Sequence, residues 1–213
     1  MKKGSGEIVA AFYPEVRVNG YSSVDGTVEF YGRINSILQS SYEVLDFGSG
    51  RAGWFEDDPC DYRRNLRSIR GKVRKLVGCD VDNAIWDNNA VDEQVQIKMG
   101  EGLPFPDASF DLIVSDYVFE HIANPKEVAD EFYRILKPGG WLCARTPNKY
   151  CYVALLTRLV KNSHHSAVLS KVQPNRREID TFPTTFKLNT LNGLSKYFQE
   201  SKYDNYTYRY EAE

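Results

Sequence analysis

A short apolar run that ends on glycine constrains this chain more than any other feature of its sequence. Residues 43–48 read EVLDFG, the pattern of a buried parallel strand that enters a tight turn. Gly48, Gly50 and Gly53 complete a GxGxxG motif. Glycines at this spacing let backbone N–H groups and a helix N-terminus come close to a ligand. The motif predicts an α/β domain with a ligand-binding turn after its first strand.

Segments with strand and helix patterns alternate along the rest of the chain. Strands are expected at 72–80, 94–98, 110–118 and 141–147, with a final alternating strand at 206–211. Helices are expected at 25–40, 58–70, 124–136 and 190–200. This alternation predicts a doubly wound, mostly parallel sheet with helices on both faces.

Two of these helices begin with capping signals. Asp25 precedes apolar residues at helical spacing and is expected to be an N-cap. Asn124, with Pro125 at the first helical position and Glu127 at the third, has the arrangement of a capping box. Lys-Pro-Gly-Gly at 137–140 is expected to end that second helix.

Length and charge indicate one domain with a small partner. The chain has 213 residues, enough to bury one substantial core. Residues 1–24 have no sustained period and are expected to form a loose arm with one short ordered piece, before a domain that spans 25–213. The net charge of −2 gives no indication of a nucleic-acid partner. No apolar run has the length of a signal peptide core or a membrane span.

The cysteines and histidines indicate neither disulfides nor a metal site. The four cysteines form no CxxC pair, which favours reduced thiols and a cytoplasmic location. The His164–His165 pair has no cysteine or third histidine close to it in sequence. We therefore predict no metal. The basic run from Arg63 to Lys75 is expected to be a solvated helix face rather than a phosphate site.

The glycine motif alone is equally typical of a dinucleotide site, but two acids bear on that interpretation. Asp46 lies two residues before the first glycine, where its carboxylate would repel a pyrophosphate but could accept hydrogen bonds from a cationic amino-acid ligand. Asp80, at the end of the strand expected at 72–80, can take both hydroxyls of an adenosine ribose. The ligand is therefore expected to be a nucleoside with a cationic group.

Four segments resemble, in order and spacing, the successive motifs of class I S-adenosylmethionine-dependent methyltransferases of the type-11 kind. They are VLDFGSGRAG (44–53), LVGCDVD (76–82), MGEGLPFPDASFDLIVSDYVFEHI (99–122) and EFYRILKPGGW (131–141). The core motifs thus cover 44–148, and 149–189 is expected to be an acceptor-side insertion. The resemblance implies a Rossmann-like sheet ordered 3-2-1-4-5-7-6. Since few residues remain for the last strand, we expect either a sheet that lacks it or a piece of a longer protein.

The resemblance also implies which residues hold the S-adenosylmethionine cofactor. Asp46, Gly48 and Gly50 would hold its methionine part, with Ser49 between them at a position that requires only a small residue. Asp80 would bind the ribose.

The remaining implied contacts lie further along the chain. Val81 would pack on the adenine, and Glu101 with Gly102 stands where the family has an acid that faces the adenine amino group. Ser115 and Asp116 would border the sulfonium and the methyl acceptor.

Methyl transfer from a sulfonium is an in-line displacement, which depends on alignment and on exclusion of water. A base is needed only if the acceptor must lose a proton. His121 is a candidate because imidazole titrates near neutral pH, although it has a packing role as an alternative. Asp116 is a second candidate, expected to touch the pocket rather than to transfer a proton.

The acceptor side is the least constrained. The segment 115–118 lacks the paired prolines of enzymes that methylate nucleic-acid bases, and this disfavours a nucleic-acid partner. Arg176, Arg177 and the stretch 180–186 suit a polar or acidic acceptor, and Tyr13 and Tyr21 could close over the donor. We expect an enzyme that methylates O or N of a small-molecule or glycan-type acceptor. The alternatives are an NAD-type oxidoreductase and a non-catalytic S-adenosylmethionine-binding module.

Overall fold

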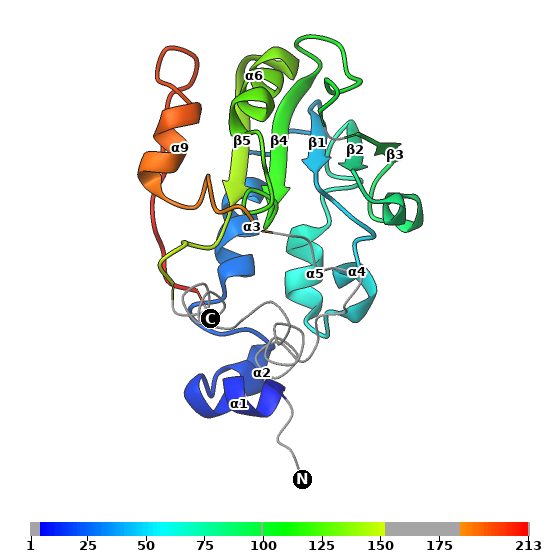
Figure 1. Ribbon diagram of the computed structural model, residues 1–213. Helices are drawn as coiled ribbons and strands as arrows, with labels where there is room; N and C mark the ends of the chain where they lie inside the picture. Colours follow the sequence, from blue (N-terminus) through cyan, green and yellow to red (C-terminus); the bar gives the residue numbers. More distant parts are fainter. Residues whose placement is uncertain (1–4, 99, 152–183, 213) are drawn as a thin grey trace.

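A single parallel sheet of five strands organises the protein. The computed structural model describes residues 5–98, 100–151 and 184–212. The sheet has the order β3-β2-β1-β4-β5, as Figure 1 shows. Its strands are β1 (Glu43–Phe47), β2 (Lys75–Asp80), β3 (Glu93–Gln96), β4 (Phe110–Asp116) and β5 (Leu136–Arg145). The chain winds outward from β1 in both directions, which confirms the predicted doubly wound α/β class and the order of the first five strands.

The strands divide their side chains between two hydrophobic cores. On β1, Val44 contributes to one core and Leu45 to the other, and both are 0% exposed. Helices α3 (Gly26–Ile37) and α5 (Asp61–Arg67) pack on the first core. Helices α6 (Pro125–Ile135) and α9 (Leu191–Tyr197) pack on the second. Both faces of the sheet are therefore covered, as its apolar strands require.

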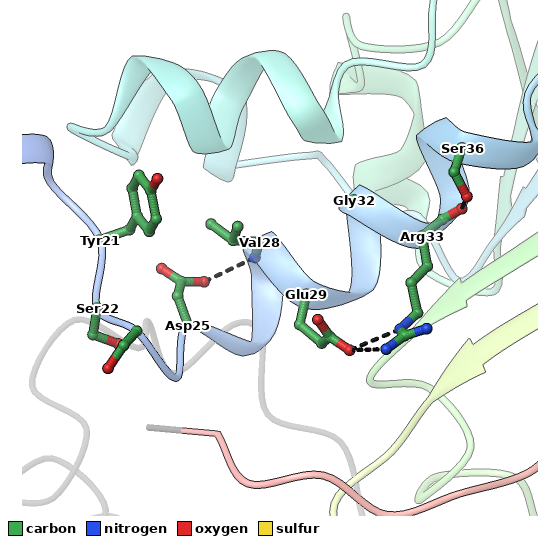
Figure 2. A pocket seen from close by; sticks show the side chains of 9 residues that line it. Tyr21, Ser22, Asp25, Val28, Glu29, Gly32, Arg33 and Ser36 are labelled. Atoms are coloured by element: carbon green, nitrogen blue, oxygen red, sulfur yellow. Dashed lines mark hydrogen bonds and ion pairs between the residues drawn. The ribbon is translucent and has the colours of Figure 1, made fainter.

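Helix α3 begins at the N-cap that its sequence predicts. The Oδ1 atom of Asp25 accepts hydrogen bonds from the backbone N–H groups of Thr27 and Val28, each at 2.9 Å. Figure 2 shows the bond to Val28. Its Oδ2 atom lies 2.7 Å from Nη1 of Arg63 in α5. One carboxylate thus caps α3 and also joins α3 to α5.

The segment after the glycine motif contains two short helices rather than the single predicted helix at 58–70. Helix α4 (Trp54–Asp57) ends before Pro59, and α5 begins after it. Asp58 has an extended backbone, with φ −78° and ψ 117°. This break has a local cause, because the ring of a proline disfavours helical geometry at the preceding residue.

The start of α6 also differs from its prediction. Pro125 occupies the first turn as expected, but the Asn124 side chain makes no capping hydrogen bond to the backbone. Its Nδ2 atom instead donates to Oε2 of Glu127 at 3.0 Å. The side chains of Asn124 and Glu127, which were predicted to cap the backbone, thus form a hydrogen bond with each other.

The Lys-Pro-Gly-Gly segment belongs to β5 and does not separate it from α6. Helix α6 ends at Ile135 and β5 starts at Leu136. The pairing of β4 with β5 shifts register between Phe110 and Leu112, and Gly139 has φ 78°. An irregularity of this kind accommodates extra residues within a strand.

Two terminal predictions need correction. Residues before Asp25 contain helices α1 (Ser5–Phe12) and α2 (Val16–Asn19), at the end of the molecule toward which the strands point (Figure 1). The predicted strand at 206–211 is wrong, since these residues are not part of the sheet. Its alternating tyrosines make other contacts: the guanidinium of Arg33 lies 5.2 Å from the ring centre of Tyr208.

None of the described helices is long and apolar enough to cross a membrane.

Replacement of Asp25 should separate its two roles. We expect Asp25→Ala to lower the free energy of unfolding by about 2 kcal/mol, because it removes the cap and one partner of Arg63. Asp25→Asn keeps an oxygen that can cap, so its loss should be less than half as large. Urea denaturation measures both values. Equal losses in the two variants would contradict a contribution from the cap.

Candidate active site

The glycine motif forms a tight turn at the carboxyl end of β1. Gly48 has φ 76°, and a Cβ atom there would lie 2.3 Å from Cγ2 of Val118. Gly50 has φ 48°, but a Cβ atom there would meet only Oδ2 of Asp80, at 3.9 Å. Gly48 therefore permits close packing, whereas Gly50 leaves space beside Asp80 in which a ligand can lie.

The turn is held from β2 and by one buried amide. The backbone N–H groups of Gly48 and Ser49 donate to the carbonyl of Cys79, at 2.8 and 3.1 Å, and that of Gly50 donates to Oδ2 of Asp80 at 2.9 Å. Nδ2 of Asn88, a residue with 0% exposure, donates to the carbonyl of Gly50 at 2.9 Å. Sequence analysis missed Asn88, because nothing in the sequence distinguishes it from the exposed Asn89.

Asp46 lies near the end of β1, and its carboxylate has a raised pKa. Its side chain is partly buried, and no described residue donates a hydrogen bond to it. Burial, together with the negative charge of Asp116, raises the pKa of Asp46 to about 7, while the charge of Arg67 opposes this rise. A cationic ligand group at this carboxylate would stabilise its ionised form and offset the effects of burial and of Asp116.

The other predicted donor contacts share the same edge of the sheet. The carboxylate of Asp80 accepts hydrogen bonds from Gly50 N and from Asp82 N, each at 2.9 Å. Val81 follows it and is 37% exposed. Glu101, in the exposed loop after β3 that also contains Gly102, has a side chain that is 66% exposed and lies 3.7 Å from Nζ of Lys98. Glu101 therefore stands at the rim and Asp80 closer to the turn.

Asp116, at the end of β4, is the centre of a charged network. Nε and Nη2 of Arg145 approach its two oxygens at 2.5 and 3.0 Å, and the hydroxyl of Tyr31 donates to Oδ2 at 3.1 Å. Nη2 of Arg67 lies 3.4 Å from the same oxygen. Burial and the charge of Asp116 raise the pKa of Tyr31 well above its usual value, so its hydroxyl remains a donor. Ser115 lies beneath this network, fully buried, with its Oγ 3.3 Å from the carbonyl of Phe47.

No sequence motif marks Tyr31, Arg67 and Arg145 as site residues; they come from α3, α5 and β5. These residues are far apart in the chain, and only folding brings them to one carboxylate. Aromatic rings stack on both guanidinium groups: Arg145 lies 4.7 Å from the ring centre of Tyr117. Tyr117 has φ 57°, a strained value for a non-glycine residue that its hydrogen bond from N to the carbonyl of Arg145 helps to maintain.

His121 sits in the turn that follows β4. Its backbone N–H donates to the carbonyl of Val118, the residue that packs on Gly48. Its Nε2 atom lies 3.9 Å from Oε1 of Glu120, and the two side chains are 19% and 9% exposed. Burial raises the pKa of Glu120, whose Oε2 accepts a hydrogen bond from Oγ1 of Thr146 at 2.9 Å.

Two cavities in the described part of the chain are lined by residues outside the glycine turn. One of about 360 Å³, drawn in Figure 2, is lined by Tyr21, Asp25 and Arg33 among others, but by none of the predicted donor residues. A second, of about 170 Å³, is lined by Thr27, Arg63, Tyr117 and Arg145 among others. The second cavity therefore adjoins the Asp116 network. Tyr21 stacks on Tyr62 with 5.2 Å between ring centres and lines the first cavity.

Several predictions concern other parts of the chain. His164, His165, Arg176, Arg177 and most of the stretch 180–186 lie outside the described residues. In the described ranges, no group of three or more His, Cys, Asp or Glu side chains could hold a metal ion. The basic run after Arg63 is largely paired, for example Arg70 with Asp92 at 2.8 Å and Arg74 with Glu43 at 2.5 Å.

The residues at this edge fit S-adenosylmethionine. The carboxylate of Asp46 has no donor among the described residues and can accept hydrogen bonds from an ammonium group. Asp80 can accept further hydrogen bonds from ribose hydroxyls, since each carboxylate oxygen has more than one acceptor site. The space at Gly50 lies between them.

Removal of the Asn88 side chain should loosen the glycine turn. We expect Asn88→Ala to lower the free energy of unfolding by about 2 kcal/mol, because buried backbone groups lose their hydrogen-bond partners. The matched variant Asn89→Ala changes an exposed side chain and should cost under about 0.5 kcal/mol. Urea denaturation compares the two. Equal effects would contradict the anchoring role of Asn88.

Asp46 should make stability depend on pH in a defined direction. Its pKa is raised from 3.8 to about 7 in the folded protein, so folding favours the protonated form. Stability therefore decreases as pH rises from about 4 to 7, by at most about 4 kcal/mol. Asp46→Asn should be more stable than the wild type at pH 8, and the difference should shrink toward pH 5. Urea denaturation at both pH values measures it.

The matched control for this pH dependence is Asp87→Asn, which changes an exposed aspartate. This variant should follow the wild type at both pH values. A constant difference between Asp46→Asn and the wild type across pH would show that Asp46 does not titrate as described.

Comparisons with known proteins agree on one family. A family model described as a methyltransferase domain matches residues 25–201. A Mycolicibacterium smegmatis protein named "Probable S-adenosylmethionine-dependent methyltransferase" is 35% identical over 87 residues, 39% of this chain and 34% of that protein. A demethylmenaquinone methyltransferase of Deinococcus radiodurans is 30% identical over 114 residues, 50% of this chain and 44% of that protein. The chain thus spans less than half the length of these two relatives.

A solved structure supports the same fold. A S-adenosylmethionine-dependent methyltransferase from Thermotoga maritima aligns with 94% of this chain and 79% of its own, with a TM-score of 0.52 and 16% identity. The family match indicates S-adenosylmethionine rather than NAD as the cofactor. The chain therefore belongs to the methyltransferase domain family, within the class I S-adenosylmethionine-dependent methyltransferases.

Proposed function

We propose that this chain transfers the methyl group of S-adenosylmethionine to an O or N atom of a small-molecule or glycan-type acceptor. The observation that carries the proposal is the carboxylate of Asp46, which has no donor among the described residues and lies next to the open space at Gly50. A carboxylate in this position suits a ligand with an ammonium group better than a pyrophosphate.

The donor side divides its tasks among separate residues. Asp46 accepts hydrogen bonds from the amino-acid end of the donor, and Asp80 accepts them from the ribose hydroxyls. Val81 packs on the adenine, and Glu101 and Gly102 flank its amino group from the rim. The bound donor supplies an electrophilic methyl group. The chain itself orients that group and excludes water, which are the main requirements of an in-line displacement.

The acceptor side is formed around the Asp116 network. The cavity of about 170 Å³ beside it is lined by Thr27, Tyr117 and Arg145, which offer hydroxyl and guanidinium donors. This lining suits the polar part of a small acceptor. Asp116 accepts hydrogen bonds from Arg145 and Tyr31. It therefore positions the side chains that line the cavity and does not remove a proton.

His121 accepts the proton of an acceptor that must lose one. Three features support this role: it follows β4 closely, it remains 19% exposed, and its Nε2 faces the carboxylate of Glu120 at 3.9 Å. Val118, whose carbonyl accepts a hydrogen bond from the backbone N–H of His121, packs on Gly48. His121 is therefore positioned next to the glycine turn.

Turnover with a panel of acceptors tests this function. The panel contains phenols, carboxylic acids, amines and sugars, and S-adenosylhomocysteine formation is measured. For the best acceptor that must lose a proton, His121→Asn should lower kcat by about 10²- to 10⁴-fold. Calorimetry should show that its affinity for S-adenosylmethionine changes by less than about 2-fold.

Two outcomes would count against the proposal. Binding of S-adenosylmethionine without turnover on any acceptor class would favour a non-catalytic module. A His121→Asn variant with wild-type kcat would remove His121 from proton transfer.

A further inference from the structure

Arg67, at the end of α5, has surroundings that its ion pair with Asp116 does not explain. Its guanidinium carbon lies 4.6 Å from the ring centre of Trp54 and 5.4 Å from that of Tyr31. The side chain is only 20% exposed. Two aromatic rings therefore fix the plane of the guanidinium group beside Asp116.

Arg67 has hydrogen-bonding capacity left over. Its Nε atom is buried and has no hydrogen-bond partner among the described residues. Only Nη2 approaches Asp116, at 3.4 Å, whereas Arg145 binds the same carboxylate at 2.5 and 3.0 Å. Arg145 and Tyr31 already donate hydrogen bonds to Asp116. The planar guanidinium of Arg67, with its paired N–H donors, is therefore suited to bind a second carboxylate.

The glycine turn does not offer an easy alternative for a carboxylate. The N–H groups of Gly48 and Ser49 are bound to the carbonyl of Cys79, and that of Gly50 is bound to Asp80. The first three amides of the turn are therefore committed to the protein. A ligand carboxylate at this edge needs a side-chain donor.

The charges of Asp46 and Arg67 match the two ends of an amino acid. Asp46 and Asp116 lie near the carboxyl ends of the neighbouring strands β1 and β4, and Arg67 contacts Asp116, which places Arg67 at the same edge of the sheet as Asp46. An α-amino acid carries an ammonium and a carboxylate on one carbon. Two opposite charges, each with free hydrogen-bonding capacity, are needed to bind it.

We infer that Arg67 binds the α-carboxylate of S-adenosylmethionine while Asp46 binds its α-ammonium. The inference rests on the proposed function and extends it to the segment that contains α4 and α5. Trp54 and Tyr31 act as positioning residues, because they hold the guanidinium plane without touching the carboxylate. The segment between the glycine turn and β2 thus becomes part of the donor site.

Equilibrium binding of two ligands tests the inference without measuring activity. S-adenosylmethionine and decarboxylated S-adenosylmethionine differ only in the carboxylate, and calorimetry gives the affinity of each. The wild type should prefer the carboxylate form. Arg67→Met should weaken S-adenosylmethionine binding by about 10- to 100-fold and leave the decarboxylated ligand within about 3-fold, so that the preference is lost.

Two further variants complete the design. Arg67→Lys keeps the charge but loses the planar fork, and it should retain part of the preference. Arg70→Met removes a nearby cation that pairs with Asp92 at the surface, and it should bind both ligands like the wild type.

The outcomes are distinct. Equal losses for both ligands in Arg67→Met would mean a structural role and would overturn the inference, as would an unchanged preference. A wild type that binds S-adenosylmethionine but does not discriminate between the ligands would overturn the inference alone. A wild type that binds neither ligand would overturn the proposed function as well.

Discussion

The parallel pairing of β1 with β2 on one side and β4 on the other is the constraint on which the rest of the structure depends. Because all the strands run the same way, their carboxyl ends meet at one edge, and the strand order changes direction between β1 and β4. In open α/β sheets, this switch point is where ligands bind. Asp80 and Asp116 are the last residues of β2 and β4, and Asp46 is the penultimate residue of β1. Asp116 is directly in register with Arg145.

Three carboxylates at one edge of the sheet repel one another, and the protein stabilises their negative charges to different degrees. Backbone amides bind Asp80, and Arg145 with Tyr31 binds Asp116. Asp46 receives no such partner among the described residues, and its raised pKa is the physical consequence. The site therefore keeps one carboxylate available for a cationic ligand. This arrangement costs stability in the free protein, as functional sites often do.

Sequence patterns predicted the elements whose causes are local. The apolar runs of the central strands, the Asp25 cap and the glycine turn depend on neighbours within a few residues, and the structure confirms them. The strand predicted at 206–211 was wrong for the opposite reason. Alternation shows only that side chains face two ways, while membership of a sheet requires a distant partner strand. The capping box at Asn124 failed because its two side chains could bind each other.

The sequence by itself determined the fold class and the methyltransferase family, and it placed acids near the ends of the central strands, since a few contiguous motifs carry all three. Only the tertiary structure decided which residues surround those acids. Tyr31, Arg67 and Arg145 converge on Asp116 from three elements, and Asn88 reaches the glycine turn from beyond β2. Such contacts have no local signal, because they arise when parallel strands and their covering helices bring distant residues to one edge.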